Sequence, residues 1–334
     1  MTVNVGVIGA GMIGADHVRR LSTIVSGAQV TAVTDIDADR AASVAAGVGA
    51  RSLATGQEVI DAADVDAVLV TSWGPAHAES VLGAIAAGKP VFCEKPLATT
   101  AEDCHKIIDA ETAHGRRLVQ VGFMRRYDAG YRAMKQVIDS GEIGTPLMVH
   151  CAHRNPTVPE RYHSEMATHD TAVHEIDTVR WLLGDEIVSA QVLTPRRTSH
   201  RFEHLQDPQI MLFETAEGAR VDVEVFVNCQ YGYDIQCEAV GETGTVRLPD
   251  PAAPVVRSAG RQSGPVLQDW KDRFAEAYDV EIQEWVDSVA AGAVSGPSSW
   301  DGYAAAMICD ANVEALHTGE IVSTGLKDRP AFYA

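Results

Sequence analysis

An apolar run that leads directly into three spaced glycines constrains the fold of this chain more than any other feature. Residues 3–8 read VNVGVI, and Gly9, Gly11 and Gly14 follow in the spacing G-x-G-x-x-G. The first glycine permits a tight turn, the second lets the backbone approach a pyrophosphate, and the third lets helix and strand pack closely. Because an apolar strand precedes the motif and a helical pattern follows it, the sequence predicts a dinucleotide-binding fold.

Short apolar runs alternate with helical patterns over about the first 120 residues. We expect strands at residues 3–8, 30–34, 67–70, 90–93 and 118–121, and helices at 12–26, 37–46, 76–87 and 101–114. The strands are apolar throughout, as in a sheet that is covered on both faces. The order predicts a Rossmann-type, doubly wound parallel sheet.

The pattern changes after Gly122. We expect helices at 129–140, 171–183, 274–291 and 300–318, strands at 147–152, 187–193, 209–214, 220–227, 235–240 and 245–247, and an irregular loop at 249–265. Consecutive strands with short connections favour a mainly antiparallel sheet. The predicted fold class is therefore α/β with two domains, residues 1–122 and 123–334.

Charge and cysteine content exclude several kinds of partner. The net charge is −19, from 27 basic and 46 acidic residues, which disfavours nucleic acid and anionic membranes. No run of about 18 apolar residues predicts a membrane span, and the N-terminus does not resemble a secretory signal. The six cysteines contain no CxxC pair, so we expect no metal site. Scattered thiols fit a cytoplasmic protein.

Asp35 indicates which dinucleotide is bound. It lies 21 residues after Gly14, at the end of the second predicted strand, where a carboxylate accepts hydrogen bonds from ribose hydroxyls. A carboxylate would repel a 2′-phosphate, and no Arg or Lys occurs at 36–39. The sequence therefore favours NAD over NADP, with the phosphates at the helix N-terminus. The alternative is that the glycines only form a turn and Asp35 only caps a helix.

Lys95 is the first candidate catalytic residue. It stands in Cys93-Glu94-Lys95-Pro96, directly after the fourth predicted strand. That position places it at the carboxyl edge of the sheet, where a nicotinamide is expected. A lysine there can hydrogen-bond a reacting hydroxyl and stabilise developing negative charge. The alternative is an ordinary surface lysine at a strand end.

Asp170 and His174 form the second candidate group. They are four residues apart, so both point to one face if this stretch is helical. Histidine is the common general base for removing a hydroxyl proton, and Asp170 can orient it or bind an adjacent hydroxyl. A buried histidine is otherwise usually structural, and His169, Glu175 and Asp177 compete for the same roles.

The stretch AHAESVLGAIAAGKPVFCEKPLATT, together with the glycine motif, resembles the glucose–fructose oxidoreductase and inositol dehydrogenase family, over nearly the whole chain. The resemblance implies a Rossmann domain and a C-terminal α/β domain with an open, mainly antiparallel sheet. It also implies catalysis by Lys95, Asp170 and His174, and a homo-oligomer, a tetramer joined through the open sheet face. Residues 1–122 would then bind NAD, and residues 123–334 would bind substrate and oligomerise.

Within that family, DTAVHEIDTVRWLL and HRNPTVPERY most resemble the myo-inositol 2-dehydrogenases. The resemblance implies NAD-dependent oxidation of a cyclic polyol, best myo-inositol to 2-keto-myo-inositol. The implied polyol contacts are Lys95, Arg125, His153, Asn155, Asp170, His174 and Tyr233. The expected cofactor contacts are Gly9, Gly11, Met12, Ile13, Gly14, Asp35, Ser72, Trp73, His77, Glu94 and Lys95.

Other functions remain open on these residues. The Trp73-Gly74-Pro75 loop replaces the family's commoner Thr-Pro-Asn type and can reshape the nicotinamide edge. The substrate could instead be scyllo- or chiro-inositol or a pyranose sugar, because epimers differ in only a few hydrogen bonds. A non-catalytic regulator that senses NAD or sugar could use the same fold, but it would have no need of the Lys95, Asp170 and His174 set.

Overall fold

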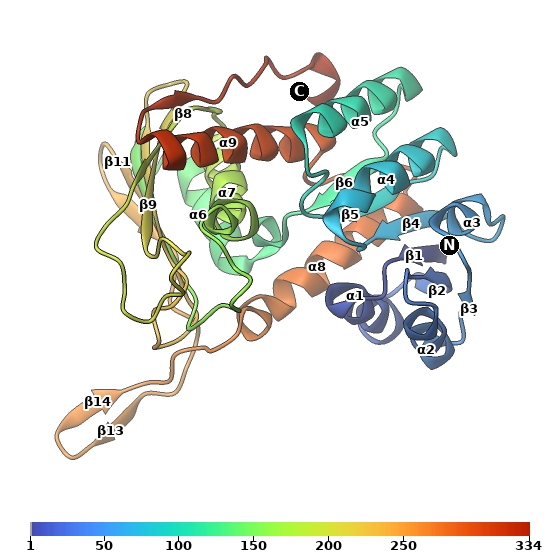
Figure 1. Ribbon diagram of the computed structural model, residues 1–334, viewed down its shortest axis with the longest axis horizontal. Coiled ribbons are helices and arrows are strands. Elements are labelled where there is room, and N and C mark those ends of the chain that lie inside the picture. Colours follow the sequence, from blue (N-terminus) through green and yellow to red (C-terminus); the bar gives the residue numbers. More distant parts are fainter. Residues whose placement is uncertain (1) are drawn as a thin grey trace. The chain divides into compact units, whose positions relative to one another are not determined.

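The computed structural model describes residues 2–334, which form two compact units (Figure 1). Of these residues, the first unit contains 2–124, Tyr278–Ala306 and Lys327–Ala334, and the second contains Arg125–Ala277 and Met307–Leu326. This division differs from the expected ranges 1–122 and 123–334, because the chain returns to the first unit. Apolar side chains of helix α8 (Trp270–Ala290) complete the first unit's core, namely Ile282, Trp285 and Val286.

A six-stranded parallel sheet forms the centre of the first unit, in the order β3-β2-β1-β4-β5-β6. Its strands are β1 (Val3–Ile8), β2 (Ala28–Thr34), β3 (Arg51–Ser52), β4 (Ala67–Val70), β5 (Val91–Glu94) and β6 (Val119–Gly122). The predicted doubly wound sheet is confirmed. The edge strand β3 was not expected, because two exposed residues carry no recognisable pattern.

Helices cover both faces of this sheet (Figure 1). One face packs against α1 (Met12–Thr23), α2 (Ala38–Val48) and the later part of α8, and the other against α3 (Gly56–Asp61), α4 (His77–Ala86) and α5 (Ala101–His114). The unit also contains the 3-10 turns η1 (Gly74–Ala76) and η4 (Ala331–Tyr333). Side-chain caps define two of the helix starts: Asp37 accepts the Arg40 N–H in α2, and Thr100 accepts the Asp103 N–H in α5.

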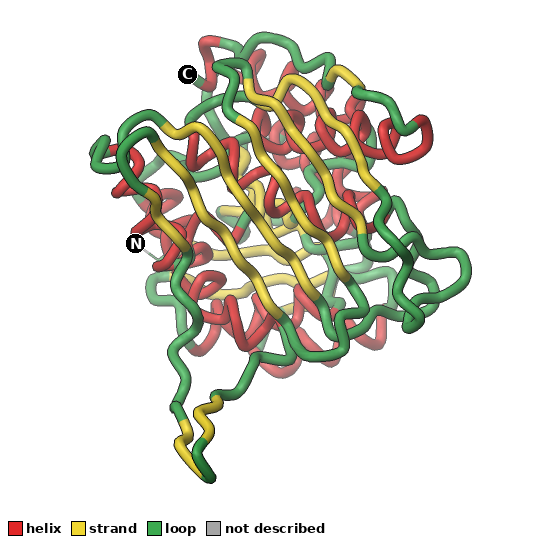
Figure 2. Tube along the Cα trace, turned by 90° about the vertical axis from the view of Figure 1, so that its left-hand side faces the viewer, coloured by secondary structure: helices red, strands yellow, loops and turns green. Residues whose placement is uncertain are grey.

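The second unit contains a seven-stranded sheet in the order β12-β11-β7-β10-β9-β8-β15 (Figure 2). Its strands are β7 (Pro146–Arg154), β8 (Ile187–Leu193), β9 (Gln209–Thr215), β10 (Arg220–Phe226), β11 (Asp234–Gly241), β12 (Thr245–Arg247) and β15 (Val322–Ser323). Neighbouring strands are antiparallel except β7 and β10, so the expected mainly antiparallel sheet is confirmed.

One face of this sheet packs against helices of the same unit, and the other is turned toward the viewer in Figure 2. The unit's helical segments are η2 (Met124–Tyr127), α6 (Ala129–Asp139), the π-helical turn η3 (Ala167–Ala172), α7 (Val173–Leu183), the start of α8 and part of α9 (Ser299–Thr318). Alternate residues of β10, Val221, Val223 and Val225, are buried, as the period of a strand requires.

The range 249–265, expected as an irregular loop, contains a small hairpin. Strands β13 (Val256–Ser258) and β14 (Arg261–Ser263) pair antiparallel around Ala259 and Gly260, both at positive φ. Two positive φ values make the tight hairpin turn that suits twisted strands. The sequence did not indicate it, because both strands are exposed and lack alternating apolar residues.

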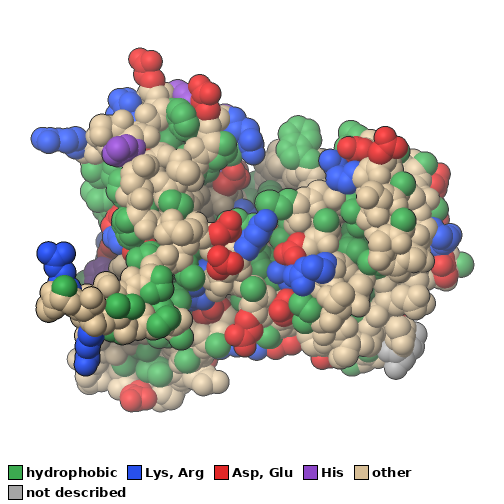
Figure 3. All heavy atoms as spheres, turned by 90° about the horizontal axis from the view of Figure 1, so that it is seen from below, with side chains coloured by type: hydrophobic (Ala, Val, Ile, Leu, Met, Phe, Trp, Pro, Cys, Tyr) green, Lys and Arg blue, Asp and Glu red, His purple; other side chains and the backbone are tan. Residues whose placement is uncertain are grey.

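The surface bears charges of both signs. Figure 3 shows acidic and basic side chains interspersed over the face that it displays, with no continuous basic area there. Among residues 2–334, no helix has the length and apolar character needed to cross a membrane.

Candidate active site

The glycine turn between β1 and α1 is shaped to receive a phosphate group. A methyl group at Gly14 would lie 2.1 Å from the Gly9 carbonyl oxygen, and Gly9 has φ +100° and faces the Ser72 backbone. At Gly11 the same methyl would meet nothing within 4 Å. Gly11 is the N-cap of α1, and neither a capping side chain nor a first-turn acid serves the helix N–H groups. The open space and the available donors therefore fit a dinucleotide pyrophosphate.

Asp35 is fixed in place by three donors. Its Oδ2 accepts the Ala10 N–H at 2.6 Å, and its Oδ1 accepts the Asp37 N–H at 2.8 Å and an Arg40 N–H at 2.5 Å. Burial raises the pKa of the carboxyl, but the hydrogen bonds from Arg40 and the two amides outweigh it and hold the pKa below its usual range. The carboxylate is therefore ionised and oriented, as the predicted ribose contact would require. Arg40 lies one position beyond the 36–39 window that the sequence argument considered.

The loops after β4 and β5 lie together at the carboxyl edge of the sheet. His77 joins them, since its Nδ1 lies 2.6 Å from the Pro96 carbonyl oxygen and its Nε2 lies 2.9 Å from the Ser72 carbonyl oxygen. The Ser72 hydroxyl is buried and has no hydrogen-bond partner among the described residues. Trp73 is 81% exposed. Of the expected contacts, Ser72 thus lies beside Gly9 of the glycine turn, Trp73 follows it in the chain, and His77 is bonded to the Ser72 carbonyl.

Glu94 supports the backbone of Lys95. Its Oε1 lies 2.8 Å from His17 Nε2, and its Oε2 accepts the Lys95 N–H at 3.2 Å. Glu94 is buried, whereas Lys95 is half-buried. The sequence analysis missed His17, which lies on the buried face of α1 and is 77 residues from its partner. The one signal in the sequence that could have indicated a role for His17 is its position three residues after Gly14, on the helix face that turns toward the sheet.

The second unit carries Asp170 and His174 on a helix that begins as a wide turn. The expected helix at 171–183 starts earlier, at Ala167, as the π-helical turn η3, and continues as α7. The Val173 N–H reaches back to the Thr168 carbonyl, five residues earlier. Asp170 is exposed in η3, and His174 is buried in the first turn of α7. π-helical turns are frequent at functional sites.

Two side chains from elsewhere in the unit hold the wide turn. The Tyr162 hydroxyl lies 2.6 Å from Thr171 Oγ1, and Asn312 Nδ2 donates to Thr168 Oγ1 at 2.8 Å. All four residues are buried. Tyr162 ends the HRNPTVPERY stretch that the sequence analysis singled out. Asn312 was not among the predicted site residues; it lies 144 residues from its partner, so no local pattern could indicate it.

Arg125, His153 and Glu175 form a buried polar cluster. Arg125 and Glu175 are ion-paired, His153 Nδ1 lies 3.0 and 3.1 Å from the two Glu175 oxygens, and Arg125 Nη2 lies 3.0 Å from the same ring nitrogen. Burial alone would raise the pKa of Glu175, but the charges of Arg125 and His153 lower it to about 2. Tyr233 packs its ring edge against His153, at 5.7 Å between centroids.

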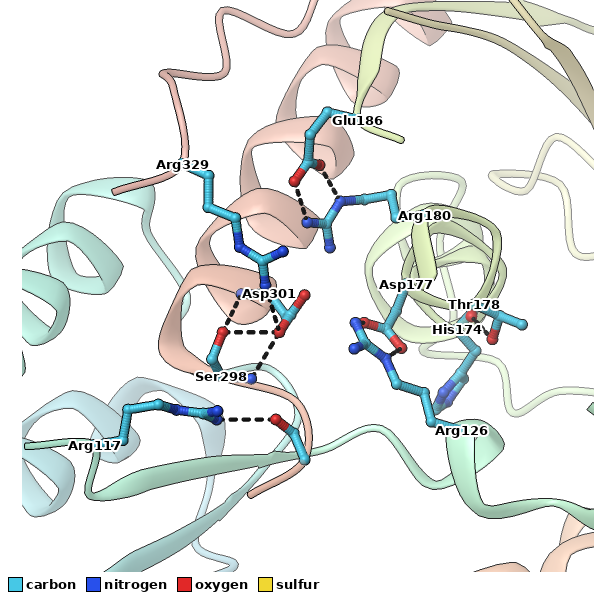
Figure 4. A network of polar contacts seen from close by, with 11 residues as sticks. Arg117, Arg126, His174, Asp177, Thr178, Arg180, Glu186, Ser298, Asp301 and Arg329 are labelled. Atoms are coloured by element: carbon cyan, nitrogen blue, oxygen red, sulfur yellow. Dashed lines mark hydrogen bonds and ion pairs between the residues drawn. The ribbon is translucent and has the colours of Figure 1, made fainter. Parts of the chain in front are cut away.

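A second arginine engages the other nearby acid. Arg126 donates to both oxygens of Asp177, at 2.9 and 2.5 Å (Figure 4). Figure 4 also shows Thr178, whose hydroxyl donates to the His174 carbonyl at 2.6 Å. Glu175 and Asp177, which competed with Asp170 for a catalytic role, are thus each paired with an arginine.

The structure brings together part of the predicted polyol contacts. Arg125, His153 and Tyr233 are in contact, and Asn155 follows His153 beyond the end of β7, with its backbone paired to Phe226 and Cys229. Asp170 and His174 belong to the same unit, whereas Lys95 belongs to the first unit. Catalytic and contact roles for all of these residues remain predictions.

Comparison with known proteins relates the whole chain to one family of oxidoreductases. Residues 3–123 match the model of an oxidoreductase family with an NAD-binding Rossmann fold, and residues 131–247 match the Gfo/Idh/MocA C-terminal domain. The chain is 73% identical to inositol 2-dehydrogenase 3 of Saccharopolyspora erythraea over 333 residues, covering 100% of this chain and 98% of the relative. It is 60% identical to inositol 2-dehydrogenase of Serratia proteamaculans, covering 100% and 99%.

Solved structures give the same relationship. The crystal structure of myo-inositol dehydrogenase from Lactobacillus casei in complex with NAD(H) and myo-inositol superposes with a TM-score of 0.98 at 42% identity, covering 100% of both chains. A myo-inositol dehydrogenase described as putative, from Sinorhizobium meliloti, gives 0.87 at 29% identity, covering 97% of this chain and 100% of that one. The fold, the two matched family regions and the full-length identity lead to one assignment: this chain belongs to the Gfo/Idh/MocA family of NAD-binding oxidoreductases.

Proposed function

We propose that this chain oxidises myo-inositol at its 2-hydroxyl, with NAD as acceptor, and forms 2-keto-myo-inositol. The observation that carries this proposal is the full-length likeness to the Lactobacillus casei enzyme, whose structure contains NAD(H) and myo-inositol. The identity of 73% to an inositol 2-dehydrogenase supports the same substrate. The glycine turn and Asp35 support the cofactor, through the open space at Gly11 and the ordered carboxylate.

Three side chains carry the proposed proton transfer and charge stabilisation. His174 accepts the proton of the reacting hydroxyl. Lys95 donates a hydrogen bond to the oxygen as it becomes a carbonyl. Asp170, one helical turn before His174, orients the histidine or binds the neighbouring hydroxyl. When bound, NAD supplies the acceptor for the hydride.

The remaining polyol contacts fall to the buried cluster of the second unit. An inositol presents a hydroxyl on every carbon, so its site needs several donors and acceptors in fixed positions. Arg125 supplies donors, and His153, Asn155 and Tyr233 each supply groups that donate or accept. The ion pair of Arg125 with Glu175 supports this role, because it fixes the guanidinium without the help of a ligand.

We also infer a homotetramer in the cytoplasm. Strands of the second unit's sheet carry exposed apolar residues, including Met148 of β7, which is 40% exposed, and Leu193 of β8, which is 44% exposed. Such residues support association with another copy of the chain. The six free thiols support a reducing compartment.

NAD reduction against a panel of polyols tests the proposal. The purified chain would be assayed with myo-, scyllo- and chiro-inositol, glucose and xylose, with NAD and with NADP. We expect the highest kcat/KM with myo-inositol and NAD. A higher value with another isomer or a sugar would replace the substrate. If no polyol were oxidised by a chain that binds NADH, the proposal would give way to a sensing role.

A further inference from the structure

Arg40 gives the ribose-binding carboxylate a cationic partner that the glycine motif does not specify. Its Nη2 lies 2.5 Å from Asp35 Oδ1, and its Nη1 lies 3.5 Å from Asp37 Oδ2. Arg40 lies in the first turn of α2 and its side chain is 43% exposed, whereas the Asp35 side chain is 5% exposed. The acid is therefore held rigidly, and the arginine has room to move.

The hydrogen bonds of Asp35 leave little capacity for a ribose while Arg40 stays paired. A carboxylate has about four acceptor positions, and Ala10, Asp37 and Arg40 occupy three of them. Two ribose hydroxyls therefore compete with Arg40 for Oδ1. If a phosphate replaced one hydroxyl, the same guanidinium would lie beside it, and arginine binds phosphate through paired N–H groups.

We propose that Arg40 is a specificity-determining residue for the cofactor: it offsets the charge of Asp35 and binds a 2′-phosphate, so that the chain takes NADP as a second, weaker cofactor. NAD stays preferred, because the arginine is already paired with two carboxylates, Asp35 and Asp37. Asp35 alone favours NAD because its carboxylate repels a 2′-phosphate, and Arg40 reduces that repulsion.

Fluorescence titrations with NADH and NADPH test the proposal without any polyol. We expect the wild-type chain to bind NADPH more weakly than NADH. Arg40→Ala should weaken NADPH binding by on the order of tenfold, the loss of one charge-assisted hydrogen bond, with NADH binding changed by less than about threefold. The matched control is Arg51→Ala, which removes another exposed arginine paired with an aspartate, Asp64, and should leave both affinities unchanged.

A second pair of variants separates attraction from repulsion. Asp35→Asn should strengthen NADPH binding, and the double variant Asp35→Asn/Arg40→Ala should lose that gain. The proposal is overturned if the wild type does not bind NADPH, or if Arg40→Ala weakens the binding of both cofactors equally. Because binding is measured without substrate, failure of the inositol proposal would leave this result intact.

Discussion

The glycine turn of the first unit and the buried cluster of the second unit position their polar groups by different means. At the turn, the polar groups are backbone N–H groups and carbonyls. Their positions depend on Gly9, Gly11 and Gly14, which lie within six positions of one another. In the cluster, the ion pair between Arg125 and Glu175 joins residues 50 apart in sequence. The first arrangement depends on local shape, and the second on compensated charge in a buried place. Substitutions in the two regions should therefore have different effects on stability, cofactor binding and turnover.

The largest effect is expected at His174, in the second unit. His174→Ala should lower kcat by a factor on the order of 10² or more, because the reacting hydroxyl loses its proton acceptor. NADH affinity should be unchanged, since the cofactor contacts are expected in the first unit. His200→Ala, at an exposed histidine outside the predicted site, is the control. Steady-state kinetics with an NADH titration checks this, and an unchanged kcat would remove His174 from the mechanism.

Loss of Glu175 should produce the largest change in stability. Glu175→Leu leaves the Arg125 charge buried without its carboxylate, which should lower the free energy of unfolding by about 3–5 kcal/mol. Replacing both partners, as Arg125→Met/Glu175→Leu, should recover most of that loss. Chemical denaturation measures it, with Lys106→Ala at an exposed ion pair as the control. Equal stability of Glu175→Leu and the wild type would show that the buried charges are not compensated by one another.

The glycines of the turn should separate folding from cofactor binding. Gly14→Ala places a methyl 2.1 Å from the Gly9 carbonyl oxygen, so it should cost about 1–3 kcal/mol of stability. Gly11→Ala meets no protein atom and should change stability far less. It should nevertheless weaken NADH binding on the order of tenfold, because the methyl obstructs a phosphate contact. Thermal unfolding and NADH titration of both variants give the comparison, which the reverse pattern would contradict.

The smallest effect is a difference in acid stability. The folded pKa of Glu175 is lowered from an ordinary 4.5 to about 2. Its contribution is therefore fully present above the ordinary value and is lost as the pH falls toward 2. Glu175→Gln should show a shallower loss of stability over that range than the wild type. Urea midpoints measured across the range check this, with the exposed Glu160→Gln as the control; parallel curves would contradict it.

Prediction from sequence succeeded where the evidence is local. The glycine turn, Asp35 at a strand end and the mainly antiparallel second sheet follow from spacing and periodicity. Helix α3 (Gly56–Asp61) was missed because six residues are too short to display a helical period. The partners that hold the site, His17 for Glu94 and Asn312 for Thr168, meet only after folding.

Arg40 is another residue whose partner could not be predicted from the sequence, although only five positions separate it from Asp35. Its position in the sequence lies just outside the window that was considered, and only the start of α2 turns it back onto Asp35. If Arg40 acts as proposed, cofactor preference depends on a helix start as well as on the motif. The charge pairs of the buried cluster could not be assigned in advance, because Glu175 and Asp177 looked equivalent until each was seen with its own arginine.

Isotope transfer tests the central claim most directly. The purified chain would oxidise myo-inositol that carries deuterium at C2, in the presence of NAD, and the NADH would be analysed by mass spectrometry. Oxidation of the 2-hydroxyl predicts monodeuterated NADH and a 2-keto product without the label. Unlabelled NADH, with deuterium retained in the product, would show that another hydroxyl reacts and would contradict the account.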